Sequence, residues 1–599
     1  MPNGADLIAR TLSAAGVKSV FAKDHQLTRP IVSAARALSG VRVISPVSET
    51  TAVPMADGCT RYTGRPAVAI TAGHGHALSQ AVGIASAWAD KSPVITISVS
   101  PSEGTDSSPI FDREKWDGPG TFSAITRWQG SIRHAVDIVP VLTRAVREAT
   151  SARCGPVHVQ VDTDAVESLI SNAPEEELIK SLSRSAQAAS PPVADPEMIE
   201  RAYKLLASAR RPLILAGGGT IRAGAVTEVN ELARRTGIPI TSTMGGMGAA
   251  LPDNPSYMGA ASYLSGEAFH TAIKEADVVL AMGVCFSGLD GFGLPPLWSP
   301  KIKFIQANIW HEDIAINPNA EIALIGDAKQ TASAMLELAP RQAPDKESEW
   351  LSKLRKLDRQ HLDRIYGEAS RDWKLIHPAA AAEAMREVFE PTEPLVVLDG
   401  GNTALWAGML IPVPGPRRGF FPVGMGTLGL GIPVALGIKS VAGDRPVILA
   451  SGDGAFMYNI QEMETMLNHD IPFTAVVFND SAWNMIRAGQ AMSGNVYGTD
   501  LPDQDYASVA KSFGISCKRV TKKEELLPTF KEARDSGGPS IIDVVTDPDS
   551  LPDSLISFAR VEFHGAKMPP AKMLKSLFKG KTPMDVRGLN LLKFIIKTV

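Results

Sequence analysis

Short runs of apolar, β-branched residues recur along the chain and alternate with longer amphipathic stretches. The runs 94–99, 278–282 and 473–478 are five or six residues long, and several such runs end at Gly or Asp. Continuous apolar runs of this length are typical of parallel strands buried on both faces. Amphipathic stretches between them, such as 197–208, are typical of crossover helices. The pattern therefore predicts an α/β fold built on doubly wound parallel sheets.

Two stretches interrupt this pattern and predict linkers. The first, 181–196, is rich in Ser, Ala and Pro, and the second begins at Ala339-Pro340 and continues into a charged segment. They divide the chain into three α/β domains, expected at 1–182, 195–338 and 372–549. A basic tail follows at 550–599, where we expect a solvated arm rather than a specific anion site. Its lysines include Lys567, Lys572, Lys575, Lys579 and Lys581.

The composition excludes several classes of protein. The 599 residues carry 60 Lys and Arg against 64 Asp and Glu, and this net charge of −4 gives no electrostatic reason to expect a nucleic-acid partner. No apolar run approaches the ~20 residues of a membrane span, and the first residues show no secretory signal. The four cysteines are far apart and form neither a metal-binding pair nor a disulfide pattern. We therefore expect a cytoplasmic enzyme that acts on small molecules.

Two acidic residues of the third block each follow an apolar run. Asp453 lies between Gly452 and Gly454, and Asp480 follows the next run. Because ligands bind at the carboxyl ends of parallel strands, we expect both carboxylates at one site. Such a pair suits Mg²⁺ or another hard cation that bridges to phosphate oxygens. The two glycines would let backbone N–H groups approach the phosphate closely.

These positions resemble the Gly-Asp-Gly…Asn-Asn motif of thiamine diphosphate (ThDP) enzymes. From about Ala5 to Asp547 the chain resembles the superfamily of acetolactate synthase, benzoylformate decarboxylase and oxalyl-CoA decarboxylase. The resemblance implies the domain order pyrimidine-binding, central and diphosphate-binding. It also implies that Asp453 and Asp480 hold Mg²⁺ through their side chains and Ala482 through its backbone carbonyl. The cofactor-binding residues that it implies, besides Glu49, are Asn402, Thr403, Gly426, Leu428, Gly452, Asp453, Gly454, Ala455, Asp480, Ala482, Trp483, Asn484 and Met485.

Two of these positions depart from the family pattern. Asp480 stands where the family usually has Asn, and an added carboxylate would bind a divalent cation at least as well. Ala455 stands where the family has Ser, which removes one hydroxyl contact to phosphate but leaves the backbone contacts. Neither change puts binding of the metal or the cofactor in doubt.

The segment 48–61 resembles the family's Glu-x-x-Ala…Ala-Asp-Gly-Tyr-Ala-Arg segment and identifies Glu49 as the cofactor-activating acid. A carboxyl group bound to N1′ of the aminopyrimidine favours the imino tautomer, which then removes the thiazolium proton. The loop 424–429 resembles the one that bends the cofactor, with Leu428 under the two rings and the Gly426 carbonyl facing the 4′-amino group. Relatives place the glutamate and the metal motif on different subunits. The resemblance thus implies a homodimer or homotetramer with active sites at subunit interfaces.

The loop Phe21–Gln26 replaces the family's Phe-Gly-x-Pro-Gly and is unusually polar. Because an imidazole exchanges protons near neutral pH, His25 is a candidate acid–base group, and a surface histidine is the alternative. Gln26, the third candidate catalytic residue, stands where simple pyruvate decarboxylases carry Asp. Ile486 stands where they carry Glu. The loss of both carboxylates argues against plain decarboxylation and favours transfer to a second carbonyl compound.

A second histidine-containing segment, 73–78, stands where the family has Gly-Pro-Gly-Ala-Thr-Asn. Either His74 or His76 could point at the cofactor, because a glycine-rich turn gives no periodicity to choose between them. A metal site made by this pair is not expected, since no third ligand is apparent.

The central block resembles the family's FAD- or ADP-binding domain. Gly217–Gly219 follow a predicted strand, and such a turn suits a phosphate. The family's Asp-x-Asp-Pro after a later strand is Asn308–His311 here. FAD or ADP is therefore left open but not expected.

The leading hypothesis is an acetolactate synthase-like carboligase, a transferase or lyase that depends on ThDP and Mg²⁺. It would act on a 2-oxo acid or related carbonyl compound through a cofactor-bound acyl anion equivalent that passes to an acceptor. Met485-Ile486 is the Met–aliphatic pair of acetolactate synthases, although their following Trp is Gly489 here. Two alternatives stay open: a C–C bond hydrolase or decarboxylase without acceptor, similar to cyclic-diketone hydrolases, and a non-catalytic paralogue of the fold.

Overall fold

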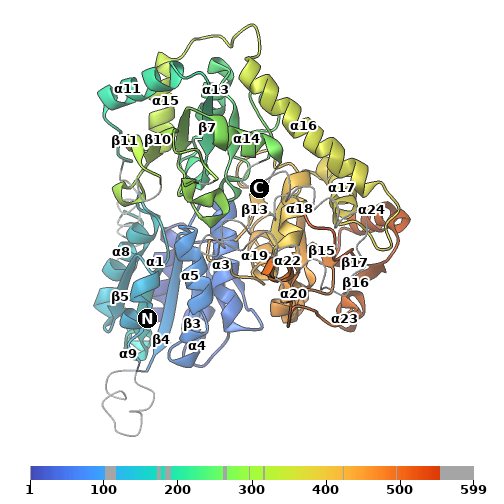
Figure 1. Ribbon diagram of the computed structural model, residues 1–599. Helices are drawn as coiled ribbons and strands as arrows, with labels where there is room; N and C mark the ends of the chain where they lie inside the picture. The colour runs from blue at the N-terminus through green and yellow to red at the C-terminus, as the bar shows by residue number, and fades with distance from the viewer. Residues whose placement is uncertain are drawn as a thin grey trace.

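The computed structural model contains three α/β domains, each built on a parallel sheet, and so confirms the predicted fold class (Figure 1). It describes residues 2–101, 116–170, 177, 179–181, 190–260, 266–295, 297–314, 318–422, 424–493 and 496–552. The lysines of the predicted basic tail lie outside the described residues. Among the described helices, none combines the length and apolarity that crossing a bilayer requires.

The N-terminal domain alternates strands with helices. Its strands are β1 (Ser19–Ala22), β2 (Arg42–Ile44), β3 (Ala67–Ala72), β4 (Val94–Ser100), β5 (Trp128–Ile132) and β6 (Val157–Asp162). Its helices are α1 (Gly4–Ala14), α2 (Arg29–Ala37), α3 (Glu49–Thr63), α4 (Gly75–Leu78), α5 (Ala81–Ala89), α7 (Gly118–Phe122), α8 (Ile138–Thr150) and α9 (Thr163–Glu167). The strand order is β2-β1-β3-β4-β6-β5, and every pairing is parallel. The central strands β3 and β4 are buried along their whole length, which explains their continuous apolar sequences.

The central domain has a five-stranded parallel sheet of order β11-β10-β9-β7-β8. Its strands are β7 (Pro212–Ala216), β8 (Ile240–Ser242), β9 (Val278–Met282), β10 (Lys303–Asn308) and β11 (Ala320–Ile325). Its helices are α11 (Pro196–Ala207), α12 (Gly218–Arg222), α13 (Val226–Thr236), α14 (Glu267–Glu275) and α15 (Ala328–Leu338). The predicted strands 212–216 and 278–282 are confirmed with the same bounds.

The C-terminal domain has the strand order β13-β12-β14-β15-β17-β16, again parallel. Its strands are β12 (Leu395–Asp399), β13 (Gly419–Phe420), β14 (Val447–Gly452), β15 (Thr474–Asn479), β16 (Ser516–Val520) and β17 (Ser540–Val545). Its helices are α17 (Pro378–Phe389), α18 (Asn402–Leu410), α19 (Gly431–Lys439), α20 (Asp453–Phe456), α21 (Met463–Asn468), α22 (Asn484–Ser493), α23 (Tyr506–Ser512) and α24 (Leu526–Ser536). Because β12, β14 and β15 are neighbours, the loops that follow them emerge at one edge of the sheet.

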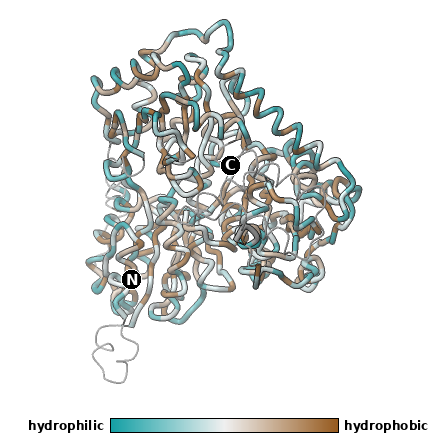
Figure 2. The backbone as a smooth tube through the Cα atoms, viewed as in Figure 1, coloured by the Kyte–Doolittle hydropathy of each residue, from teal (hydrophilic) through white to brown (hydrophobic). Residues whose placement is uncertain are grey.

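The second predicted linker is mostly a helix. The charged segment forms the 21-residue helix α16 (Glu349–Ala369), which packs against α14 of the central domain and α17 of the C-terminal domain. Figure 2 shows hydrophilic residues along much of its length, whereas a narrower set of side chains, including Leu354 and Ile365, is buried. The sequence suggested a linker because a helix that buries only a narrow stripe has a largely polar composition.

The N-terminal and C-terminal domains share one hydrophobic core, in which α3 packs against α19 (Figure 1). The two helices cross at glycines. A Cβ atom on Gly58 would lie 2.3 Å from the Val434 carbonyl oxygen, and one on Gly437 would lie 1.9 Å from the Met55 carbonyl oxygen. Only glycine permits this backbone approach, which fixes α3, and Glu49 at its start, relative to the C-terminal domain.

Candidate active site

Three loops of the C-terminal domain meet beyond the ends of β12, β14 and β15. A Cβ atom on Gly452 would lie 3.2 Å from the Thr403 hydroxyl oxygen, so the loops after β12 and β14 are in contact. A Cβ atom on Gly454 would lie 2.5 Å from the Trp483 ring, so the loop after β15 covers the loop after β14. The structure thus brings together the residues that the sequence predicted to bind diphosphate.

The two predicted metal ligands lie in this group of loops, where Asp453 is buried and Asp480 is half-buried. Oδ1 of Asp453 accepts the Gly454 N–H at 2.8 Å, whereas Oδ2 is buried and has no hydrogen-bond partner among the described residues. Burial, and next the charge of Asp480, raise the pKa of Asp453 to about 7. Burial likewise raises the pKa of Asp480 to about 6. A divalent cation would relieve both the buried charge and the unpartnered oxygen.

The turn after β15 holds Asp480 in place. The Asn484 amide donates to Asp480 Oδ2 at 2.8 Å and to the Pro548 carbonyl at 2.7 Å. The Ala482 N–H donates to Asp480 Oδ1 at 3.2 Å, which follows from the left-handed backbone of Ser481 (φ 51°). The described residues contain no group of three or more His, Cys, Asp or Glu side chains that could hold a metal ion. Further ligands would therefore be carbonyl, water or phosphate oxygens, which is the donor set that Mg²⁺ prefers.

Asp399, at the end of β12, is a site residue that sequence analysis missed. Its buried carboxylate accepts N–H groups from Gly400 at 2.7 Å, Gly429 at 3.2 Å and Gly431 at 2.7 Å. Burial raises its pKa to about 6 against the effect of these bonds. The carboxylate thereby ties the loop that carries Asn402 to the loop 424–429. An acidic residue ending a buried strand was the available signal.

The loop 424–429 lies at the surface of the chain. Gly426 is exposed and has a left-handed backbone (φ 65°), which favours glycine there. Leu428 is half-buried, so core packing alone does not account for it. The Asn459 amide donates to the Gly429 carbonyl at 2.6 Å and connects this loop to the segment that follows α20.

Glu49 is the first residue of α3, and a residue of the C-terminal domain positions this helix start. Glu462 is fully buried at the end of the 3₁₀ segment η8 (Met457–Glu462). Its carboxylate accepts the N–H groups of Val47 and Ser48, both at 3.1 Å, and the Thr51 hydroxyl at 2.9 Å. These bonds satisfy backbone donors at a helix start and hold it firmly.

The Glu49 side chain meets the two histidine-containing segments. Its Oε1 atom lies 3.0 Å from His76 Nδ1, and the His25 and His76 ring centroids are 5.2 Å apart. Gln26 is exposed beside His25, and His74 has a left-handed backbone (φ 59°). Within the described part of this one chain, no hydrogen bond joins Glu49 to His74 or to the loops around Asp453.

Three family models match the chain. The thiamine pyrophosphate enzyme N-terminal TPP binding domain matches residues 2–123, the central domain 199–335, and the C-terminal TPP binding domain 399–544. The probable acetolactate synthase large subunit of Methanocaldococcus jannaschii is 30% identical over 567 residues, which cover 92% of this chain and 93% of the relative. The chain belongs to the thiamine pyrophosphate (ThDP) enzyme family.

Within that family it falls in the acetolactate synthase superfamily. The acetolactate synthase isozyme 3 large subunit of Escherichia coli is 26% identical and covers 89% of this chain and 92% of its own length. The 2-hydroxyacyl-CoA lyase of Arabidopsis thaliana is 25% identical, and the match covers 91% of this chain and 96% of the relative.

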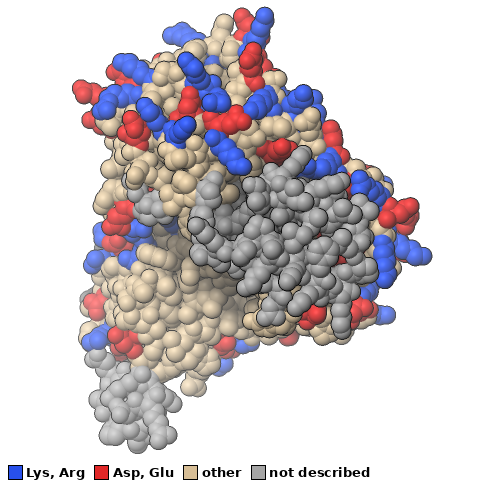
Figure 3. All heavy atoms as spheres, in the orientation of Figure 1, with Lys and Arg blue, Asp and Glu red and all other residues tan. Residues whose placement is uncertain are grey.

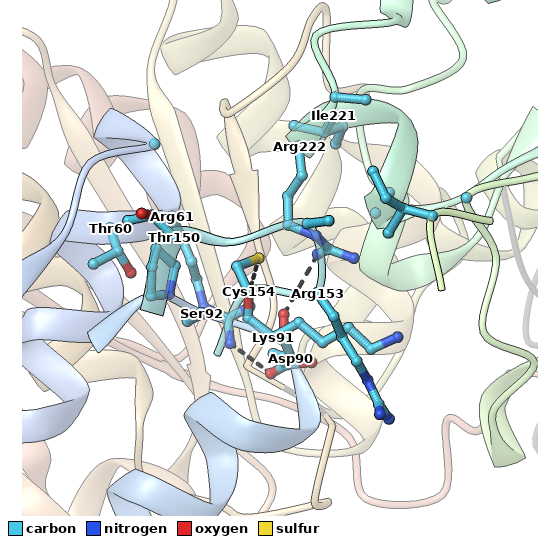
Figure 4. A pocket seen from close by; sticks show the side chains of 18 of the residues that line it. Thr60, Arg61, Asp90, Lys91, Ser92, Thr150, Arg153, Cys154, Ile221 and Arg222 are labelled. Carbon is cyan, nitrogen blue, oxygen red and sulfur yellow. Dashed lines mark hydrogen bonds and ion pairs between the residues drawn. The ribbon is translucent and has the colours of Figure 1, made fainter. Parts of the chain in front are cut away.

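This ThDP enzyme also has a cavity of about 870 Å³ between its N-terminal and central domains (Figure 4). Residues of the C-terminal domain complete its wall. Gly218 and Gly219, at the start of α12, lie in the lining, as do Asn308 and Ile309 after β10. The basic lining residues are Arg61, Arg65, Lys91, Arg147, Arg153, Arg222 and Arg417.

Several of these cations have acidic partners, whereas others form no ion pair with the part of the chain that the structure describes. Arg61 pairs with Asp90 at 2.5 Å, and Lys91 pairs with Asp313 at 2.6 Å. Among the described residues, the Arg222 guanidinium donates a single long hydrogen bond, 3.4 Å to the Asp90 carbonyl. Burial, and next the charge of Arg222, lower the pKa of Arg417. Like charges thus face each other across the cavity, which makes it electropositive.

Proposed function

We propose that this protein is a ThDP- and Mg²⁺-dependent carboligase that transfers an acyl unit from a 2-oxo acid to a second carbonyl compound. The observation that carries the proposal is the buried Asp453, whose Oδ2 has no hydrogen-bond partner among the described residues, beside the half-buried Asp480 in the glycine loops of a ThDP enzyme. The acetolactate synthase relatives and the absence of a carboxylate at Gln26 and Ile486 favour ligation over simple release.

Different residues of the chain would bind the metal, the diphosphate and the aminopyrimidine. Asp453 and Asp480 would hold Mg²⁺, and the backbone N–H groups at 452–455 would bind the diphosphate. Glu49 would exchange a proton with N1′ of the aminopyrimidine. Leu428 would support the rings. When bound, ThDP would supply the electron sink that lets a bond beside a carbonyl carbon break.

We further propose a homodimer, or a dimer of dimers, with active sites between subunits. No hydrogen bond or ion pair joins Glu49 to the metal loops of its own chain among the described residues, although both would be needed at one cofactor. Large apolar side chains are exposed around both halves: Leu78 and Val82 near Glu49, and Met457 and Tyr458 near Asp453. The surface over α4 and α5 also shows few charged side chains (Figure 3). A second copy of the chain would cover these surfaces.

The electropositive cavity favours a nucleotide with linked phosphates as a second, non-reacting ligand. ADP and FAD are the two probes, and isothermal titration calorimetry measures the affinity of the protein for each. Arg222→Gln should weaken nucleotide binding by roughly tenfold, because a hydrogen bond to a charged group is lost. Arg355→Gln, at an exposed ion pair outside the cavity, is the matched control. Failure of both ADP and FAD to bind the wild-type protein would refute this assignment.

A panel of 2-oxo acids, each with and without aldehyde or keto-acid acceptors, tests the main proposal. Products are identified by mass spectrometry in the presence of ThDP and Mg²⁺. Acyloin or 2-hydroxy-2-oxo acid products that need the acceptor support a carboligase. Aldehyde release with no dependence on acceptor would favour the decarboxylase or hydrolase alternative. Failure of ThDP and Mg²⁺ to raise the melting temperature would refute cofactor binding altogether.

A further inference from the structure

The Glu49 side chain has a neighbour to which no role has been assigned, the imidazole of His76. Sequence analysis left His74 and His76 as equal candidates. The structure distinguishes them: His76 Nδ1 lies 3.0 Å from Glu49 Oε1, while His74 forms the left-handed residue before α4. The His76 side chain is 49% exposed and that of Glu49 is 24% exposed, so this hydrogen bond lies at the surface of the subunit where the pyrimidine would dock.

The backbone and the side chain of Glu49 are fixed by different residues. Glu462 holds the start of α3, but it makes no bond to the Glu49 carboxylate. Glu49 has three rotatable side-chain bonds, and in the described part of the chain its carboxylate is hydrogen-bonded to His76 alone. The His25 ring lies beside the His76 ring, with 5.2 Å between the two centroids.

We propose that His76 is a positioning residue for Glu49. By donating Nδ1–H to Oε1, it orients the carboxylate and leaves Oε2 free to face N1′ of the aminopyrimidine. When one carboxylate oxygen is held by a hydrogen bond, the direction in which the other oxygen can form its own hydrogen bond is fixed. A supporting residue positions a proton-transferring residue in this way. This inference rests on the proposed function, because it concerns the residue that would activate ThDP.

Two substitutions of His76 separate a hydrogen bond at Nδ1 from other effects. In His76→Asn the amide nitrogen lies near the position of Nδ1 and can still donate to Glu49. In His76→Gln the amide lies near the position of Nε2 and cannot reach the same carboxylate oxygen. His74→Asn is the matched control, because it makes the same substitution two residues away, where no hydrogen bond to Glu49 is found among the described residues.

Two measurements report on the cofactor without turnover. The exchange of the ThDP C2 proton with D₂O, quenched in acid and read by ¹H NMR, reports activation. The quenching of tryptophan fluorescence by ThDP and Mg²⁺ reports affinity. We expect His76→Gln to slow exchange roughly 10- to 100-fold, as the loss of a hydrogen bond to a charged group predicts. His76→Asn and His74→Asn should exchange at nearly the wild-type rate, and no variant should change ThDP affinity by more than about threefold.

The results distinguish this inference from the proposed function. If the wild-type protein binds no ThDP, both are overturned. If the wild type binds ThDP and exchanges the proton while His76→Gln exchanges equally fast, only the role of His76 is overturned. Equal slowing in His76→Asn and His76→Gln also overturns it, because the hydrogen bond would then not be what matters. Melting temperatures of the cofactor-free variants confirm folding, and the half-exposed position of His76 predicts little change.

Discussion

Replacing Asp453 with Asn tests whether the site holds buried carboxylates that need a cation. Asn has nearly the same shape, and its side-chain oxygen can still accept the Gly454 N–H. In the metal-free protein, burial and the Asp480 charge raise the pKa of Asp453 from 3.8 to about 7. A carboxyl group with a higher pKa in the folded state than in the unfolded chain destabilises the fold wherever it is ionised.

The size of this effect follows from the shift. A change from 3.8 to about 7 corresponds to at most about 4 kcal/mol at pH values above 7. As the pH falls through 7 the folded carboxyl becomes protonated, and the penalty shrinks. It vanishes below about pH 4, where the carboxyl is protonated in both states. Metal-free Asp453→Asn should therefore be more stable than wild type near pH 8, by up to about 4 kcal/mol, and equally stable near pH 4.

Thermal unfolding in EDTA at several pH values measures this difference. The expected rise in melting temperature near pH 8 is at most about 16 °C, at roughly 2–4 °C per kcal/mol for a domain of 150–250 residues. Saturating Mg²⁺ and ThDP should then reduce the difference. A ligand at 100 times its Kd stabilises the wild type by about 2.7 kcal/mol, whereas the variant should gain little because it lacks a metal ligand.

Two outcomes would refute the reasoning. If Asp453→Asn melts below wild type in EDTA near pH 8, the carboxylate is not an uncompensated buried charge. If the difference does not change with pH, its origin is not the ionisation of Asp453. The measurement near pH 4 is the internal control, because there the two proteins differ only in packing.

Two further predictions concern assembly and packing. Glu49→Gln and Asp453→Asn should each abolish exchange of the ThDP C2 proton. If each site spans two subunits, mixing the two variants should restore up to about a quarter of the sites, because a mixed dimer has one site with both residues intact. No recovery would place both residues in one subunit's site. Gly437→Ala should lower the free energy of unfolding by about 1–3 kcal/mol, because the added Cβ would lie 1.9 Å from the Met55 carbonyl oxygen. Gly367→Ala, in α16 with no atom within 4 Å, should instead stabilise by about 0.5–1 kcal/mol, and denaturation curves of the two variants would show opposite shifts.

The strands were predictable because burial on both faces gives a short, continuous apolar sequence, as in β4 and β9. The acidic pair was predictable as well, since each residue directly follows such a strand and neighbouring parallel strands end at one edge. The helix α16 was not predictable, because it buries only a narrow stripe of its surface and its composition is therefore largely polar. The sequence could not predict whether His74 or His76 faces Glu49, because a glycine-rich turn carries no periodicity.

The sequence by itself therefore determined the fold class and the loops that carry Asp453 and Asp480, and the family resemblance of its motifs implied the order of the domains. All of these depend on residues close together along the chain or on the regular geometry of parallel strands. Folding in three dimensions decided that Glu462 supports the start of α3, that His76 contacts Glu49, and that arginines of all three domains line one cavity. Glu462 and Ser48 are 414 residues apart in the chain. Contacts over such separations follow from how the sheets and helices pack, and local patterns of residues do not encode them.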